Sequence, residues 1–304
     1  MQCDERGQGW ANPLRPGPSL RDMVERVRVT RNRRANAGST CAIFLWWMRA
    51  EGSVFANVAS WPATVNLRQL QRHWNEFGKT DPLYAVLSHP GMQGGKWDVD
   101  EFLATGRRDI DAAMTLDAKY GPVAKAAALD FGCGAGRLTQ ALAEHFDRVV
   151  GVDIAASMIE EARALNRFGE RCEFVVNTTD DLSLFGNDSF DLVYSDIVLQ
   201  HMDPRYAGKY IREFLRLVRP SGLVFFQVPE PMRWQFVKAL APEWALAVYR
   251  RARGRAGPVM QMFGMTSAQV QRLVNEAGGR VVASRPTGSA GKFPAHIYVC
   301  GSGV

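Results

Sequence analysis

Residues 126–153, AAALDFGCGAGRLTQALAEHFDRVVGVD, decide the fold of this chain. An apolar run at 126–131 leads into three glycines at alternate positions. An amphipathic segment follows, with Leu138, Leu142 and Phe146 on one stripe, and a second apolar run then ends at the carboxylate of Asp153. This order predicts a strand, a tight turn, a helix and a second strand.

The glycine loop and Asp153 together indicate a ligand site. Gly132, Gly134 and Gly136 let the backbone turn sharply and approach a ligand at the helix N-terminus, where a Cβ would stand in the way. Asp153, at the tip of the second strand, is placed to accept two hydrogen bonds from a ribose diol. We therefore expect a cofactor that carries a nucleoside, although the loop alone is also compatible with an ordinary strand-to-helix turn.

The spacing of the glycines decides between cofactors. A dinucleotide fingerprint has the form GxGxxG, whereas this chain has DxGxGxG, with Arg137 where the last glycine of the fingerprint would fall. Asp130 adds a negative charge beside the loop, which disfavours a diphosphate and suits an ammonium or sulfonium ligand. A Rossmann-type NAD(P) oxidoreductase is therefore a minor alternative.

Over residues 130–222 the sequence resembles the class I S-adenosylmethionine-dependent methyltransferases, with a likeness to type-11 domains that act on small molecules. The resemblance implies an α/β fold: a three-layer α/β/α Rossmann-like sheet of seven strands, the last antiparallel, with an N-terminal helical cover. It implies S-adenosylmethionine as the cofactor. The cofactor-binding residues that it suggests are Asp130, Gly132, Gly134, Gly136, Asp153, Met158, Thr178, Thr179 and Ser195.

The resemblance also implies where these residues act. Asp153 would hold the ribose, and the glycine loop would form the wall beside the methionine part. Thr178 and Thr179 would border the adenine, and Ser195 would lie near the sulfonium. The family usually has Asp where this chain has Thr178, so Asp180 is a second acceptor candidate, and both could instead satisfy local turns.

The segment after the strand at 189–194 contains the candidate catalytic residue. His201 is the only histidine near the position where such families place the acceptor, and its ordinary pKa would suit a general base. It could equally cap or pack the helix that begins at Asp203 and Pro204. No dedicated catalytic triad is expected, because the sulfonium already carries an activated methyl group.

Both flanks of the core segment can be divided by composition. We expect residues 1–59 to be a disordered extension, residues 60–124 to form a helical cap, and residues 125–304 to form the cofactor-binding domain. Phe102 and Gly106 in the cap could cover the cofactor or simply pack on the sheet. The apolar stretch 41–48 is too short to span a bilayer, and Met48 is a candidate start of the native protein.

The C-terminal third departs from the alternating pattern. After a strand at 223–228, residues 229–264 are rich in aromatic residues and arginine, as expected of an insertion that forms a lid over an apolar or anionic acceptor, or of a solvated amphipathic helix. Thr266 and Gln269 predict a capping box for the helix that follows. Segments 280–284 and 296–300 have the pattern of a terminal strand pair.

The distribution of charge and the spacing of the cysteines limit the partners and metal sites that we expect. Most of the net charge of +6 lies in residues 1–50, which hold nine arginines against four carboxylates, so we expect no nucleic-acid partner. The five cysteines are scattered, which favours reduced thiols and a cytoplasmic location, and neither they nor the dispersed histidines have the spacing of a metal site. Stable membrane insertion is not expected either.

The predicted function is methyl transfer from S-adenosylmethionine to a small-molecule or lipid-like acceptor. The main alternative is a module that binds the cofactor without turnover and serves regulation. Neither the acceptor, nor whether O, N or C is methylated, nor the oligomeric state can be inferred from the residues.

Overall fold

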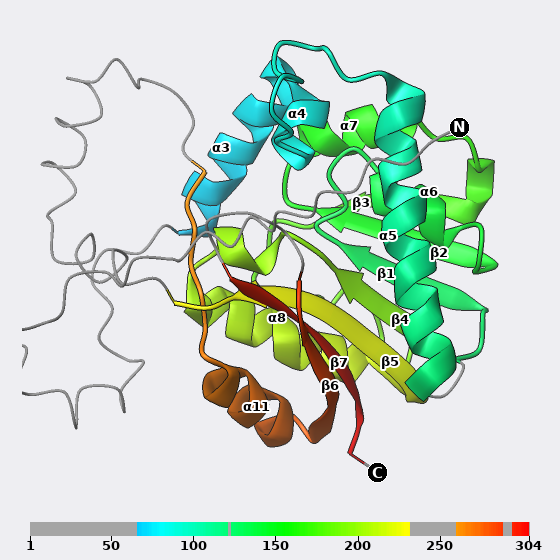
Figure 1. The fold of residues 1–304 in the computed structure, drawn as a ribbon, viewed down its shortest axis with the longest axis vertical. Helices are drawn as coiled ribbons and strands as arrows, with labels where there is room; N and C mark the ends of the chain where they lie inside the picture. Colours follow the sequence, from blue (N-terminus) through cyan, green and yellow to red (C-terminus); the bar gives the residue numbers. More distant parts are fainter. Residues whose placement is uncertain (1–65, 121–122, 232–259, 288–293, 304) are drawn as a thin grey trace, which may run out of the picture. The chain divides into compact units, whose positions relative to one another are not determined.

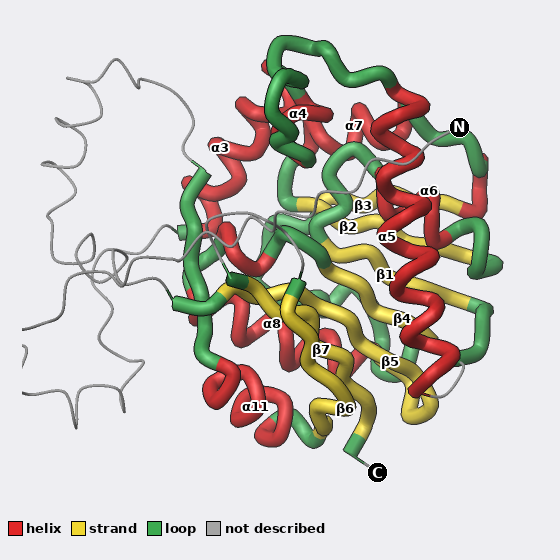
Figure 2. The backbone as a smooth tube through the Cα atoms, viewed as in Figure 1, coloured by secondary structure: helices red, strands yellow, loops and turns green. Residues whose placement is uncertain are grey.

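The computed structural model describes residues 66–120, 123–231, 260–287 and 294–303. They contain a seven-stranded sheet of order β3-β2-β1-β4-β5-β7-β6 (Figures 1 and 2). The strands are β1 (Ala127–Phe131), β2 (Arg148–Asp153), β3 (Cys172–Val176), β4 (Phe190–Ser195), β5 (Val218–Pro229), β6 (Gly279–Pro286) and β7 (Ala295–Ser302).

The strand directions confirm the predicted topology. Strands β1 to β5 pair in parallel, whereas β7 is antiparallel to both β5 and β6. The order reverses at β1, since β2 lies on one side of it and β4 on the other. In parallel sheets the crevice beyond such a reversal point is where ligands bind.

Helices cover both faces of the sheet (Figure 1). Alternate residues of β1 face opposite layers: Ala128 belongs to the apolar core beneath α5, α6 and α7, and Leu129 to the core beneath α8 and α11. The helices are α3 (Leu67–Thr80), α4 (Pro82–Val86), α5 (Val99–Tyr120), α6 (Arg137–Leu142), α7 (Ala156–Ala164), α8 (Pro204–Leu217) and α11 (Ser267–Glu276), with short 3₁₀ turns η4 (Gly169–Arg171) and η5 (Leu199–His201).

Several helices begin at a side-chain cap, including the two predicted at Thr266 and Asp203. The Thr266 hydroxyl accepts from the backbone N–H of Gln269, and the Gln269 side chain accepts in return from the Thr266 N–H, as expected for a capping box. Asp98 Oδ1 accepts from the N–H of Glu101 at the start of α5. Asp203 caps α8 through the Arg205 N–H.

The start of β5 differs most from the prediction. Residues 219–222, which precede the predicted strand at 223–228, are part of β5, which starts at Val218. The pairing register with β4 shifts between Phe190 and Leu192, so these residues form an irregular start of the strand. Proline and glycine within the segment suggest a turn, but an irregular strand end also accommodates them.

Other predictions concern residues outside the described ranges. The predicted extension 1–59, with its stretch 41–48, and most of the predicted insertion 229–264 fall there. These domain limits stay predictions, as does the cytoplasmic location. Within the described ranges, no helix combines the length and apolar character needed to cross a membrane.

Candidate functional site

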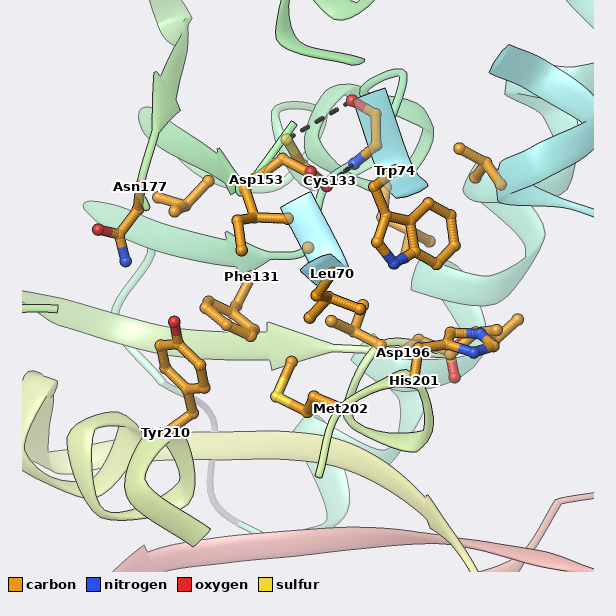
Figure 3. Close-up of a pocket in the computed structure, with 18 of the residues that line it drawn as sticks. Leu70, Trp74, Phe131, Cys133, Asp153, Asn177, Asp196, His201, Met202 and Tyr210 are labelled. Atoms are coloured by element: carbon orange, nitrogen blue, oxygen red, sulfur yellow. Dashed lines mark hydrogen bonds between the residues drawn. The ribbon is translucent and has the colours of Figure 1, made fainter. Parts of the chain in front are cut away.

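A crevice opens where β1, β2 and β4 end (Figure 3). It contains about 860 Å³ of empty space, counted out to its open mouth. The glycine loop, the ends of the three strands and the loop after β4 form its floor and sides. Helix α3 contributes Leu67, Leu70 and Trp74.

The three glycines of the loop have distinct roles. All three have positive φ angles, of 78° at Gly132, 51° at Gly134 and 82° at Gly136. A Cβ on Gly132 would lie 2.3 Å from Val198 Cγ2, and one on Gly134 would lie 2.5 Å from Val86 Cγ2. These two glycines line the crevice, whereas Gly136 is the N-cap of α6 and packs near the Phe174 ring.

Asp153 lines the crevice at the tip of β2, the position expected of a ribose ligand. Its Oδ2 accepts a hydrogen bond of 2.9 Å from the Gly134 N–H, and its Oδ1 accepts one of the same length from the Ala155 N–H. Burial raises the pKa of this carboxyl, and the backbone hydrogen bonds oppose that rise. The carboxylate is thereby held in one orientation beside the glycine loop.

Asp130 lies fully buried behind the same loop and does not line the crevice. Its Oδ2 accepts from the Thr139 hydroxyl at 2.6 Å, but its Oδ1 has no hydrogen-bond partner among the described residues. Burial raises the pKa of Asp130 to about 7. An unpartnered buried carboxylate oxygen is costly, and a nearby cation would offset that cost.

Two charged residues of the crevice received no cofactor role from the sequence. Asp196, directly after β4, lines the crevice, and burial raises its pKa to about 6 although the Arg137 guanidinium opposes the rise. Arg137 is also buried; its Nη1 donates to Thr105 Oγ1 at 3.2 Å and to Asp109. Carboxylates therefore surround one well-anchored cation at this end of the crevice.

Ile197 is the strained residue of the site. Its φ of 61° lies in the left-handed region, which β-branched residues rarely adopt. The Gln227 side chain accepts from its backbone N–H at 3.0 Å and so helps to hold it. Strain of this kind is concentrated at functional sites, and no feature of the sequence announces it.

Besides Asp130 and Gly136, four more of the predicted cofactor residues lie outside the lining of the crevice. Ser195 is buried and donates to the Phe131 carbonyl at 3.1 Å, which ties β4 to β1. Met158 is buried in a small cluster with Ala85 and Ala155. Thr178 and Thr179 are both exposed.

The neighbour of the two threonines, Asn177, does line the crevice. Its Nδ2 donates to the Asp181 carbonyl at 2.7 Å, and its Oδ1 accepts from the Thr179 hydroxyl at 2.8 Å. These hydrogen bonds fix the loop after β3. Asn177 is the residue of this loop that lines the crevice.

The two cap residues considered as a cofactor cover pack elsewhere. Phe102 belongs to a core cluster with Leu83 and Ala135, and Gly106 lies against the backbone of Arg137. Neither lines the crevice. Helix α3 lines the crevice instead; it lies within the predicted helical cap, but the sequence did not predict it as a wall of the site.

His201 lines the crevice and is buried. Its Nδ1 lies 2.7 Å from the Gln261 carbonyl, which can only accept, so Nδ1 carries the proton. Burial lowers the pKa of His201 to about 4, so the ring is neutral at physiological pH. Nε2 lies 3.1 Å from Gln200 Nε2 and is then a hydrogen-bond acceptor. The Trp74 ring packs against the His201 ring in an edge-to-face arrangement, with 5.3 Å between the ring centroids (Figure 3).

A parallel sheet with an antiparallel β7, a glycine loop after β1 and an acidic residue after β2 define a class I methyltransferase fold, and the cofactor of this class is S-adenosylmethionine. Residues 128–222 match the model of the methyltransferase domain family. This part of the chain is therefore a methyltransferase domain, and the resemblance predicted from the sequence is confirmed.

Curated relatives share this domain rather than their full length. The ubiquinone biosynthesis O-methyltransferase of Coxiella burnetii is 29% identical over 160 residues, which cover 51% of this chain and 56% of that enzyme. Phosphoethanolamine N-methyltransferase 3 of Arabidopsis thaliana is 27% identical over 107 residues, covering 35% of this chain and 22% of that one. The chain thus spans about half the length of the Coxiella enzyme, and less of the plant enzyme.

The fold is also similar to solved structures. Magnesium protoporphyrin IX methyltransferase from Synechocystis PCC 6803, with bound SAH, matches with a TM-score of 0.54 at 18% identity, covering 77% of this chain and 99% of that one. At this identity the similarity concerns the fold alone.

Proposed function

We propose that this protein transfers the methyl group of S-adenosylmethionine to a small, largely apolar acceptor. The observation that carries the proposal is the crevice, where a glycine cradle, the fixed carboxylate of Asp153 and apolar walls meet at one edge of the sheet. The cofactor supplies an activated methyl group when bound. The protein then needs mainly to align the acceptor with it and to exclude water.

The residues at the charged end of the crevice fit the cofactor. Each Asp153 oxygen accepts one backbone hydrogen bond and keeps acceptor capacity for a ribose hydroxyl. Asp196 and the unpartnered Oδ1 of Asp130 supply negative charge for the ammonium and sulfonium groups. For the adenine border we assign Asn177, which lines the crevice, in place of Thr178.

The other end of the crevice suggests the character of the acceptor. Leu67, Leu70, Trp74 and Met202 give it apolar and aromatic walls, which favour a small aromatic or lipid-like molecule. The name of the Coxiella relative, a ubiquinone biosynthesis O-methyltransferase, supports an acceptor that carries a hydroxyl group on an apolar frame.

We assign His201 as the base for such a hydroxyl acceptor. The bound cofactor would supply the methyl group, with its thioether as the leaving group, and Nε2 would take the proton that the acceptor hydroxyl loses. The Gln261 carbonyl holds the opposite ring nitrogen and so fixes the orientation of Nε2. The low pKa keeps Nε2 unprotonated at neutral pH but makes it a weak base.

Calorimetric titration with S-adenosylhomocysteine tests the cofactor assignment. We expect Asp153→Ala to weaken binding by about tenfold or more, because two charge-assisted hydrogen bonds to the ribose are lost. Asp147→Ala, which removes an exposed carboxylate that does not line the crevice, is the control and should bind as the wild type does. Equal affinity of all three proteins would refute the assignment.

A further inference from the structure

A second, smaller cavity lies apart from the loop after β4 and is bounded by α5, α6 and the segment after α7. It contains about 220 Å³ of empty space, counted out to its open mouth. Three arginines from three separate parts of the chain, Arg107, Arg137 and Arg167, line it, together with Gln140 and Glu144. Nothing in the proposed methyl transfer uses this cavity.

Two of its lining side chains carry unpartnered buried donors. Arg137 and Gln140 are each 3% exposed, and neither Arg137 Nε nor Gln140 Nε2 has a hydrogen-bond partner in the part of the chain that the structure describes. The orientation of the Gln140 amide is fixed, because its Oε1 accepts from the Arg167 N–H at 2.9 Å. Two buried donors without acceptors are a costly arrangement, which an acceptor in the cavity would relieve.

The charged groups around the cavity are compatible with a bound anion. Asp109 pairs with Arg137 through Nη1, and Asp100 pairs with Arg167 through Nη1 at 2.5 Å. These acidic partners are not among the lining residues. The lining carboxylate is Glu144, which is exposed and able to turn toward solvent.

We propose that this cavity binds a small oxyanion, with inorganic phosphate as its probe. The Nε of Arg137 and the amide of Gln140 donate to it from the buried side, and the guanidinium groups of Arg107 and Arg167 donate from the rim. Arginine forks and amide donors match the geometry of an oxyanion. A single buried water is the competing occupant, because it could accept from both buried donors.

The test is the thermal midpoint of the full chain, measured against increasing phosphate, with sodium chloride at matched ionic strength as the reference. We expect a saturable rise with phosphate beyond that with chloride. Arg107→Ala should weaken the apparent affinity about tenfold, since one charge-assisted hydrogen bond is lost. Glu144→Gln should strengthen it, because a repelling carboxylate is removed.

Gln140→Glu provides the sharpest variant. It is nearly isosteric and replaces the buried donor Nε2 with a carboxylate oxygen, so it should abolish the phosphate response, measured against its own midpoint in chloride. Arg137 stays unchanged throughout, because it also lines the crevice. The proposal is overturned if phosphate and chloride act alike on the wild type, as a water-filled cavity requires, or if Arg107→Ala and Gln140→Glu keep the full response.

Discussion

At the residue scale, Asp130 links stability to pH. Burial raises its pKa in the folded protein from the ordinary value of 3.8 to about 7. A raised carboxyl pKa contributes stability that is complete below about pH 4 and is lost as the pH rises through 7. Urea unfolding between pH 4.5 and 7.5 measures this loss. We predict that the free energy of unfolding of Asp130→Asn falls less with rising pH than that of the wild type. The exposed control Asp147→Asn should fall as the wild type does. An unchanged slope in Asp130→Asn would contradict the assignment.

Alanine variants of two glycines with positive φ distinguish the cost of backbone strain from the cost of a steric clash. At Gly132 a Cβ would lie 2.3 Å from Val198, whereas at Gly169, with a φ of 57°, it would meet nothing within 4 Å. In both alanine variants the left-handed backbone conformation costs about 1–2 kcal/mol of folding free energy. Gly132→Ala should cost about 1–3 kcal/mol more through overpacking, and only this variant should lose affinity for S-adenosylhomocysteine. Chemical unfolding and calorimetry provide the two measurements, and similar losses in both variants would exclude a steric role for Gly132.

The role of His201 is tested by separating binding from turnover. Loss of a general base lowers turnover by about 10²–10⁴, so His201→Gln should reduce kcat by that order while S-adenosylhomocysteine binds as before. Because the pKa of His201 is about 4, its titration should leave no inflection between pH 6 and 8 in the wild-type profile. A kcat that survives the substitution would remove His201 from the mechanism.

At the element scale, α3 is held on α7 by a polar contact that also positions the crevice wall. The Asn75 side chain accepts from the Ser157 N–H at 3.2 Å and from its hydroxyl at 3.3 Å. Asn75→Ala leaves that N–H unpaired and should cost about 1–3 kcal/mol. It should also raise the acceptor KM, because Trp74 on the same helix stands beside His201.

Urea unfolding and steady-state kinetics measure these two effects. Asn275→Ala, an exposed position on α11, is the matched control and should change neither quantity. If Asn75→Ala is destabilised but keeps the wild-type acceptor KM, α3 is structural cover and does not shape the acceptor site.

Local chemistry explains which elements were predictable. The capping box of Thr266 and Gln269 was predicted because both side chains act within one turn. The equivalent pair at Asn66 and Gln69 was missed although it has the same spacing. The irregular start of β5 was not predictable, because pairing with β4, which the local sequence does not encode, overrides the turn preference of Pro220 and Gly222.

At the scale of the whole molecule, the sheet order follows from alternating strand and helix segments together with the family resemblance. The site is predictable only where one short segment builds it, as for the glycine loop and Asp153. Trp74 and Gln261 meet at His201 from distant parts of the chain, so no local pattern reveals them. Thr178 and Asn177 are adjacent, and the backbone path, rather than residue type, decides which one lines the crevice.

We propose that this crevice holds a sulfonium nucleoside rather than a dinucleotide. Titration of the purified chain with S-adenosylmethionine, with NAD in a parallel experiment, tests it most directly. We predict saturable binding of S-adenosylmethionine at one site per chain and no heat from NAD. Binding of NAD, or no binding of S-adenosylmethionine by folded protein, would refute this assignment of the crevice.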